Sequence, residues 1–251
     1  MLKAEHITVR AGKNPILQDV SFHACSGEWW MVIGPNGAGK STLLSALSGT
    51  VECEGVVTLC SAHLATLSVR RRAQLLSVLS QNSQTSDDFT VEQVVAMGRY
   101  SRRRGILGTE EPDAEQYVSA ALLATGMEQL RTRRVRTLSG GERQRTFLAQ
   151  VFCQDPQVLL LDEPANHLDL IHQKQMFELI DAWRQQEGRL VLSVVHDLSL
   201  ARRFGTHALM LSDGRCVCAG SIRDVMNDST INHVWGMDVR AWRDELHAAW
   251  E

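Results

Sequence analysis

Long apolar runs, a large net charge and paired cysteines are all absent from this sequence. No stretch approaches the roughly 18 apolar residues that a membrane-spanning helix needs, and residues 1–5 lack the apolar core of a signal peptide. The formal net charge of −3 argues against a general nucleic-acid binder, although it permits a local basic patch. We therefore expect a soluble, cytoplasmic protein, and its 44% hydrophobic content predicts an ordinary packed core.

Cysteine is present, but not in a metal-binding pattern. The six cysteines form no C-x-x-C pair. The nearest two, Cys216 and Cys218, would point alternate ways on a strand, which is poor geometry for a metal ion. We favour reduced, structural thiols over a zinc site or a disulfide.

The strongest positive signal is a phosphate-binding loop. Residues 29–33 are apolar and rich in strand formers, and leucines at helical spacing follow from position 43 until Ser48-Gly49. Between them lies a run that fits the pattern G-x-x-x-x-G-K-[ST], with a strand and a helix where that motif requires them. The run consists of Gly34, Pro35, Asn36, Gly37, Ala38, Gly39, Lys40, Ser41 and Thr42.

The residue types of this loop explain its spacing. Its glycines allow a tight turn whose N–H groups point inward, and the helix that follows adds the positive end of its dipole. Lys40 supplies a mobile positive charge for the outer phosphates, and the Ser41 hydroxyl suits Mg²⁺. An ordinary glycine-rich turn is the alternative, but it leaves the register of strand, loop, Lys-Ser pair and helix unexplained. The loop therefore predicts a nucleotide site.

The segments on either side of this loop predict strands. Residues 2–10 and 16–24 alternate around a turn, which predicts an antiparallel ribbon. Trp29 and Trp30 are consecutive on a strand and face opposite sides, so core packing is favoured over stacking of both on one base. After the loop, an apolar run ends at Gln81 and gives way to a polar connector.

Residues 90–138 predict a helical insert. Thr90 and Gln93 form a capping pair, and an Ala/Leu-rich helix is expected over 114–125. Two arginine clusters, 99–104 and 131–136, flank this insert. A solvated face is the favoured interpretation of both, and contact with an acidic partner or membrane head groups is the alternative.

A second glycine motif, Leu138-Ser139-Gly140-Gly141-Glu142, precedes a helix-like run. Ser139 and Glu142 have the spacing of a capping box, so a well-capped helix is the plain interpretation. Consecutive glycines, however, cost helix stability and expose N–H groups at a positive helix end. The motif therefore also suits a second anion site.

Two carboxylates and a histidine follow buried strands. Residues 158–161 are apolar without alternation and end in Asp162 and Glu163, at the edge where open α/β sheets bind ligands. Asp162 suits hydrated Mg²⁺, and Glu163 suits orienting and deprotonating a water. Pro164 biases Glu163 toward an extended backbone. His196 ends a further strand at the same edge, which favours a role at the terminal phosphate over a structural one.

Together, the loop at 34–42, the segment 138–142, Asp162-Glu163 and His196 resemble the ATP-binding subunits of ABC transporters over nearly the whole chain. Ser139-Gly140-Gly141 is the specific part, since phosphate loops and apolar-Asp-Glu strands occur in many NTPases. The resemblance implies an α/β P-loop NTPase (RecA-like) core with an N-terminal antiparallel β subdomain and an inserted α-helical subdomain. Within this single domain, the catalytic lobe is expected at 1–84 and 155–251 and the helical subdomain at 85–154.

The resemblance also implies roles that composition and spacing do not show. Such ATPases form head-to-tail dimers in which each ATP lies between one subunit's phosphate loop and the other's segment 138–142. Gln81 matches the glutamine that contacts Mg²⁺ and water, and 166–169, ending at Asp169, match the loop that crosses the dimer interface. The expected catalytic residues are then Lys40, Gln81, Glu163 and His196, and the expected metal ligands are Ser41, Gln81 and Asp162.

Residues 90–100 and 234–239 resemble importers of iron siderophores, haem and vitamin B12. The expected partners are two membrane permease subunits and, through them, a substrate-binding protein, with this chain on the inner face of the cell membrane and no nucleic acid bound. One alternative is a soluble ABC-type ATPase acting on nucleic acid or ribosomes, which the arginine clusters could serve. Such proteins commonly carry paired ATPase units or long coiled coils, and neither is present here. An exporter's ATPase is the other alternative. The sequence does not identify the transported solute.

One position departs from the family pattern. An aromatic residue that stacks on adenine usually stands where Ala11 falls, near the end of the first strand. Ala11 has no ring, so we expect weaker base selectivity unless Arg10 or another residue substitutes for it.

Overall fold

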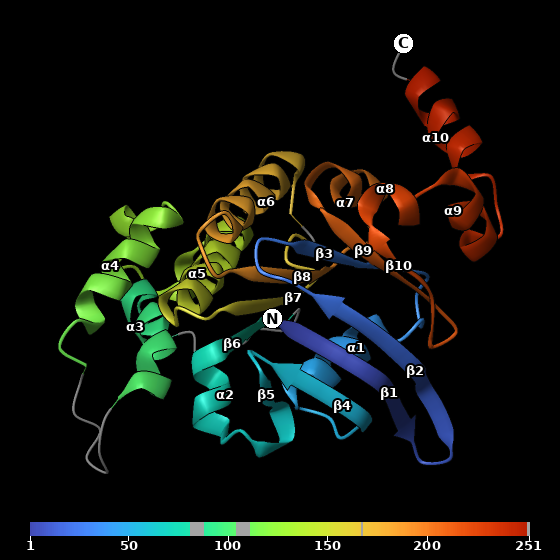
Figure 1. Cartoon of the computed structure of the whole chain (residues 1–251). Coiled ribbons are helices and arrows are strands. Elements are labelled where there is room, and N and C mark those ends of the chain that lie inside the picture. Colours follow the sequence, from blue (N-terminus) through green and yellow to red (C-terminus); the bar gives the residue numbers. More distant parts are fainter. Residues whose placement is uncertain (81–87, 104–110, 167, 250–251) are drawn as a thin grey trace.

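The computed structural model describes residues 1–80, 88–103, 111–166 and 168–249 (Figure 1). Gln81, the polar connector from 82 to 87 and His167 lie outside the described residues, so the expectations for them stay predictions. The strands of the described part form two sheets, and helices surround them.

Within the described ranges, the first sheet has four strands in the order β2-β1-β4-β5. β1 (Leu2–Ala11) and β2 (Asn14–Ala24) pair antiparallel, so the predicted ribbon is confirmed. β4 (Glu54–Leu59) pairs with the other side of β1, and β5 (Ala62–His63) lies at the edge. The apolar face of this sheet packs against the helix that follows the phosphate loop.

The second sheet has, in the same ranges, six strands in the order β10-β9-β3-β8-β7-β6. Neighbouring strands are parallel except for β10, which runs antiparallel to β9. The central strands are buried along their length, as their unbroken apolar runs predict. The strands are β3 (Trp29–Ile33), β6 (Leu76–Leu79), β7 (Val158–Asp162), β8 (Leu190–Val194), β9 (His207–Ser212) and β10 (Arg215–Ser221).

One group of helices lies beside the β6 edge of this sheet (Figure 1). It contains α3 (Val91–Ala96), α4 (Ala114–Ala124) and α5 (Gly140–Cys153), which pack against one another. The helices expected after Thr90 and over 114–125 are thus confirmed, as is the Thr90–Gln93 capping box. Short 3-10 turns accompany this group: η2 (Met97–Arg102), η3 (Glu128–Leu130) and η4 (Val135–Thr137).

The remaining helices lie around the sheets, except the last one, which projects away from them (Figure 1). They are α1 (Lys40–Ser48), α2 (Val69–Leu75), α6 (Leu170–Arg184), α7 (Leu198–Phe204), α8 (Ile222–Val225), α9 (Asp228–Trp235) and α10 (Val239–Ala248), with a 3-10 turn, η1 (Leu64–Thr66). Within the described residues, no helix combines the length and apolarity that crossing a bilayer requires.

Trp29 and Trp30 fill the two layers on either side of β3. Trp29 stacks on Phe177 with ring centroids 5.5 Å apart, and Trp30 stacks on His207 at 5.0 Å. The two indoles belong to different buried clusters. The predicted core packing is therefore confirmed.

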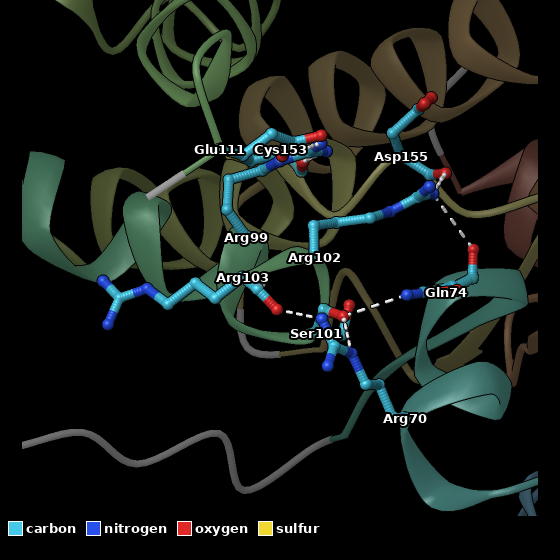
Figure 2. Close-up of polar contacts among 9 residues, drawn as sticks. All are labelled: Arg70, Gln74, Arg99, Ser101, Arg102, Arg103, Glu111, Cys153 and Asp155. Carbon is cyan, nitrogen blue, oxygen red and sulfur yellow. Dashed lines mark hydrogen bonds and ion pairs between the residues drawn. The ribbon is translucent and has the colours of Figure 1, made fainter. Parts of the chain in front are cut away.

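Arg99 and Arg102 of the first arginine cluster turn inward, whereas Arg103 is exposed, as predicted, and Arg104 lies outside the described residues (Figure 2). Arg99 is only 3% exposed, and its guanidinium contacts the Glu111 carboxylate at 2.5 Å and donates to the Cys153 carbonyl at 2.8 Å. Arg102 donates to the backbone carbonyl of Asp155 at 3.1 Å. The prediction of a solvated face is wrong for both residues. A charge pattern along the sequence does not reveal carbonyl acceptors that folding brings from more than 50 residues away.

The second arginine cluster, residues 131–136, contains both paired, partly buried side chains and exposed ones. Arg131 bridges Glu92, at 2.6 Å, and Glu115, and its side chain is 27% exposed. Arg134 and Arg136 are more than half exposed and lie near Asp88 at 3.3 and 3.7 Å. The solvated face is thus confirmed for Arg134 and Arg136 and wrong for Arg131.

A bulge in β10 separates Cys216 from Cys218. Cys216 lies opposite Leu211, while Cys218 lies opposite the next residue, Met210, so Val217 is extra. Residues two apart on a regular strand share one face. The predicted alternate directions are therefore correct, but only because of the bulge: the two thiols pack against different buried clusters.

The six thiols are free and differ in exposure. Cys25, just after β2, is exposed, Cys153 is buried, and the other four are half-buried. Burial raises the pKa of Cys153 to about 12 and that of Cys216 to about 11. It also raises the pKa values of Cys53, Cys60 and Cys218.

Candidate functional site

The phosphate loop connects the buried end of β3 to the first turn of α1. Gly34 has φ of +150°, and a Cβ there would lie 2.1 Å from the carbonyl oxygen of Leu211 on β9. Gly39 has φ of +93° at the N-cap of α1, where a Cβ would meet the Leu17 side chain at 2.6 Å. Both positions require glycine for conformation and for space. The loop is therefore held between β9 and β2.

Lys40 is buried in the loop that it follows. The residue is 6% exposed, and Nζ donates to the carbonyl oxygens of Gly34 at 2.9 Å and Pro35 at 2.8 Å. Burial lowers the pKa of Lys40, and the carboxylates of Glu163 and Asp162 act in the opposite direction. These carbonyl bonds hold the ammonium group at the mouth of the loop.

Ser41 and Asp162 bring two oxygen ligands together. Ser41 lies in the first turn of α1 and Asp162 at the carboxyl end of β7, and the hydroxyl donates to Oδ1 at 3.1 Å. Burial raises the pKa of Asp162, while the Ser41 bond lowers it. Adjacent hydroxyl and carboxylate oxygens are the donors that Mg²⁺ prefers, so this pair fits that ion.

Glu163 has a different backbone from the one expected. Its φ is +52°, in the left-handed region, so the predicted extended conformation is wrong. The N–H still donates to the Val194 carbonyl of β8 at 3.3 Å, while the carbonyl accepts from Asn166 N at 3.1 Å. The chain must leave the sheet and turn at one residue, and these two bonds impose that turn against the preference of a residue before proline.

The side chain of Glu163 is held at both oxygens. Oε1 lies 2.6 Å from Nε2 of His196, and Oε2 accepts from Nδ2 of Asn166 at 2.7 Å. The Glu163 side chain is 14% exposed and that of His196 45%. Neighbouring parallel strands β7 and β8 end at the same edge, which brings Asp162, Glu163 and His196 together as their positions in the sequence predict.

The second glycine motif forms the start of α5. Ser139 Oγ accepts from Glu142 N at 3.3 Å, and Glu142 Oε2 accepts from Ser139 N at 2.8 Å, which confirms the capping box. The Ser139 backbone and side-chain bonds lower the pKa of Glu142. Ser139 and Gly140 are exposed. In the part of the chain that the structure describes, no hydrogen bond joins Ser139, Gly140 or Gly141 to the phosphate loop.

Asp169 caps α6 and holds a histidine that the sequence reasoning missed. Its Oδ1 accepts from His172 N at 2.9 Å and lies 2.8 Å from His172 Nδ1. The sequence reasoning also missed Gln144, whose amide donates to the Pro164 carbonyl at 3.0 Å. A polar residue three positions after an N-cap was an available signal for His172, but no local pattern marks Gln144.

The end of β1 offers little to a nucleotide base. Ala11 is exposed, and the neighbouring Arg10 is paired through Nε with Oε1 of Glu54 at 3.0 Å. Arg10 is therefore already engaged by the first sheet. The expectation of weak base stacking stays a prediction.

The family can be assigned from this set of segments. The model of the family described as ABC transporter matches residues 17–166, which contain the phosphate loop, the second glycine motif and both carboxylates. This chain belongs to the ABC transporter family. The resemblance drawn from the motifs is thereby confirmed, and with it the ATPase class.

Curated relatives in this ABC transporter family span almost the whole chain. This chain is 34% identical over 237 residues to the ferric enterobactin transport ATP-binding protein FepC of Escherichia coli (strain K12), and the match covers 94% of this chain and 87% of FepC. This chain is 40% identical over 245 residues to the hemin import ATP-binding protein HmuV of Pseudomonas fluorescens (strain Pf0-1), and the match covers 95% of this chain and 94% of HmuV.

A solved structure carries the same fold. The dimeric, post-hydrolysis state of the ATP-binding cassette MJ0796, bound to ADP and Pi, matches with a TM-score of 0.78 at 24% identity. The match covers 89% of this chain and 99% of that chain. The predicted α/β P-loop NTPase core is therefore confirmed.

Proposed function

We propose that this ABC ATPase is the motor subunit of an importer for iron-siderophore, haem or cobalamin-type solutes. One observation carries the ATPase part: Lys40, Asp162 and the Glu163–His196 pair meet around the phosphate loop at a single sheet edge. The importer part is supported by relatives, since FepC is named for ferric enterobactin transport and HmuV for hemin import.

In this proposal, ATP lies on residues 34–42 with its outer phosphates at Lys40. The ammonium group exchanges its bonds to the Gly34 and Pro35 carbonyls for phosphate oxygens. Ser41 and Asp162 would hold Mg²⁺, with Gln81 as a further ligand expected from the sequence. The ion, when bound, neutralises phosphate charge.

Glu163 is the proposed general base. Its carboxylate is oriented by His196 and Asn166, so it accepts a proton from a water that lies at the terminal phosphate. His196 keeps Glu163 in place before nucleotide is bound, and its Nε2–H is the donor that would polarise the phosphate once nucleotide is present. Lys40 stabilises the charge that develops there.

A second copy of the chain completes each site. Ser139 and Gly140 are exposed at the positive end of α5, which suits contact with the phosphates of ATP bound to a partner copy. Leu138, Gly141 and Glu142 support that segment, and Asp169 lies in the turn that crosses between copies. We assign the helical subdomain to 85–154 and the catalytic lobe to 1–84 and 155–251, a division that the mutual packing of α3, α4 and α5 supports.

The remaining partners are two permease subunits and, indirectly, a substrate-binding protein, with this chain on the inner face of the membrane. The inward-turned Arg99, Arg102 and Arg131 weaken the case for nucleic acid, because their charges are already used within the chain.

Two measurements test the proposed function. Phosphate release by the purified chain is expected with ATP and Mg²⁺ and is expected to stop when EDTA removes the metal. Affinity purification of the tagged chain from membranes is expected to recover a permease. Recovery with ribosomes or DNA and without a permease would overturn the importer assignment.

A further inference from the structure

The second glycine motif and the helix after Asp169 touch within one chain. The imidazole of His172, on α6, packs against the backbone of Gly141, on α5: a Cβ added to Gly141 would lie 2.8 Å from Cδ2 and 3.1 Å from Cγ of that ring. Carbon atoms do not approach so closely in a packed interior. The imidazole can therefore occupy this position only because residue 141 is a glycine.

Asp169 fixes that ring. One carboxylate oxygen accepts the backbone N–H of His172 at 2.9 Å and lies 2.8 Å from Nδ1 of the same residue. Rotation of the ring away from Gly141 breaks the second of these contacts. Hydrogen bonds to His172 lower the pKa of Asp169, so the carboxylate is charged and accepts at neutral pH.

Two more side chains join the same elements. Gln144 donates to the Pro164 carbonyl at 3.0 Å, and Arg145 donates to Oε1 of Gln175 at 3.0 Å. These three contacts connect the first half of α5 to the described part of the segment that runs from Glu163 into α6. Contiguous contacts of this kind can carry a displacement from one element to the other.

We propose that His172 is a positioning residue that makes the glycine segment 139–141 and the turn at Asp169 move as one body. This rests on the proposed function, in which the glycine segment faces the partner's ATP and the Asp169 turn crosses to the partner. Displacement of the glycine segment by nucleotide in one site then shifts the turn that follows Glu163 in the other. His172 acts through Gly141 and Asp169 and does not touch the nucleotide.

The first test separates turnover from nucleotide affinity in the full-length chain. For His172→Ala, we expect kcat to fall about tenfold, as for other coupled contacts, with an unchanged KM for ATP and a Hill coefficient closer to one. His172→Asn keeps a donor for Asp169, and His172→Phe keeps a ring beside Gly141, so each retains part of the lost rate. Lys174→Ala, on the same helix with 73% of its side chain exposed, is the matched control and keeps wild-type values.

The second test is a double-mutant cycle measured by urea unfolding, which does not depend on activity. Gly141→Ala places a methyl group against the ring, so it is expected to change the unfolding equilibrium constant about tenfold beside His172 and much less in the His172→Ala chain. Equal effects in both backgrounds, or wild-type kcat and Hill coefficient for His172→Ala, overturn this inference and leave the ATPase intact. A wild-type chain without ATPase activity overturns the proposed function instead.

Discussion

His196 and Glu163 meet across two neighbouring strands, with Nε2 of the imidazole 2.6 Å from Oε1 of the carboxylate. Asn166 donates to the other carboxylate oxygen at 2.7 Å. A carboxylate fixed at both oxygens has a defined direction, and direction is the first requirement of a general base.

Glu163→Gln tests the role of this carboxylate. The amide preserves size and can still contact His196, but it cannot accept the proton of water. Phosphate release is expected to fall by about 10²-fold or more, while equilibrium ATP binding is retained and ATP is expected to trap the proposed dimer on gel filtration. Glu178→Gln, on the outer part of α6, serves as the control. Hydrolysis at the parent rate would remove Glu163 as the base.

Ala11→Tyr tests base recognition. Arg10 is paired with Glu54. A ring added at position 11 would therefore supply the stacking on the base that Ala11 does not provide. Stacking on a base is worth about 1–3 kcal/mol, so the KM for ATP is expected to fall and the preference for ATP over GTP to rise. Steady-state kinetics with both nucleotides measure this. An unchanged KM and an unchanged preference would contradict it.

Arg99→Met tests the buried arginine of Figure 2. The Arg99 side chain is 4% exposed, and its loss leaves the Glu111 carboxylate, 25% exposed, without that partner. Breaking a buried ion pair costs about 3–5 kcal/mol, so the midpoint of urea unfolding is expected to fall strongly. Arg136→Met is the matched control, since that side chain is 55% exposed and lies 3.7 Å from Asp88. Equal losses in the two variants would refute the buried role.

Glu142→Gln tests the capping box through pH. Ser139 donates to the charged carboxylate and holds the pKa of Glu142 below its ordinary value of 4.5, so its contribution to stability is present above that value and is lost as pH falls through the folded-state pKa. Glutamine keeps an acceptor but does not titrate. The difference in Tm between wild type and variant is expected to shrink from about pH 6 to about pH 3. A constant difference would show that the charge of Glu142 does not matter.

Features set by neighbours in sequence could be predicted. The capping boxes at Thr90 and Ser139 require only residues three positions apart, and the phosphate loop needs only its own glycines between a strand and a helix. The meeting of Asp162 and His196 was also predictable, because parallel strands that end in polar residues place them at a common edge.

Features set by contacts between residues distant in sequence could not be predicted from the sequence. The left-handed backbone of Glu163 depends on a bond to Val194 in another strand, and the inward turn of Arg99 depends on the Cys153 carbonyl. The contact between His172 and Gly141 joins two helices whose packing no local periodicity reports. In each case, the residue type was compatible with a local preference that a tertiary contact then overrode.

The unequal exposure of the thiols makes the native chain ready for site-specific labelling. Cys25 is exposed, whereas burial raises the pKa values of the other five and so reduces their reactive thiolate. A maleimide dye or spin label is expected to attach first at Cys25, without removing any cysteine. In the proposed dimer, two labelled copies would carry one probe each, and the distance between the probes would report whether the pair opens and closes as ATP is bound and hydrolysed.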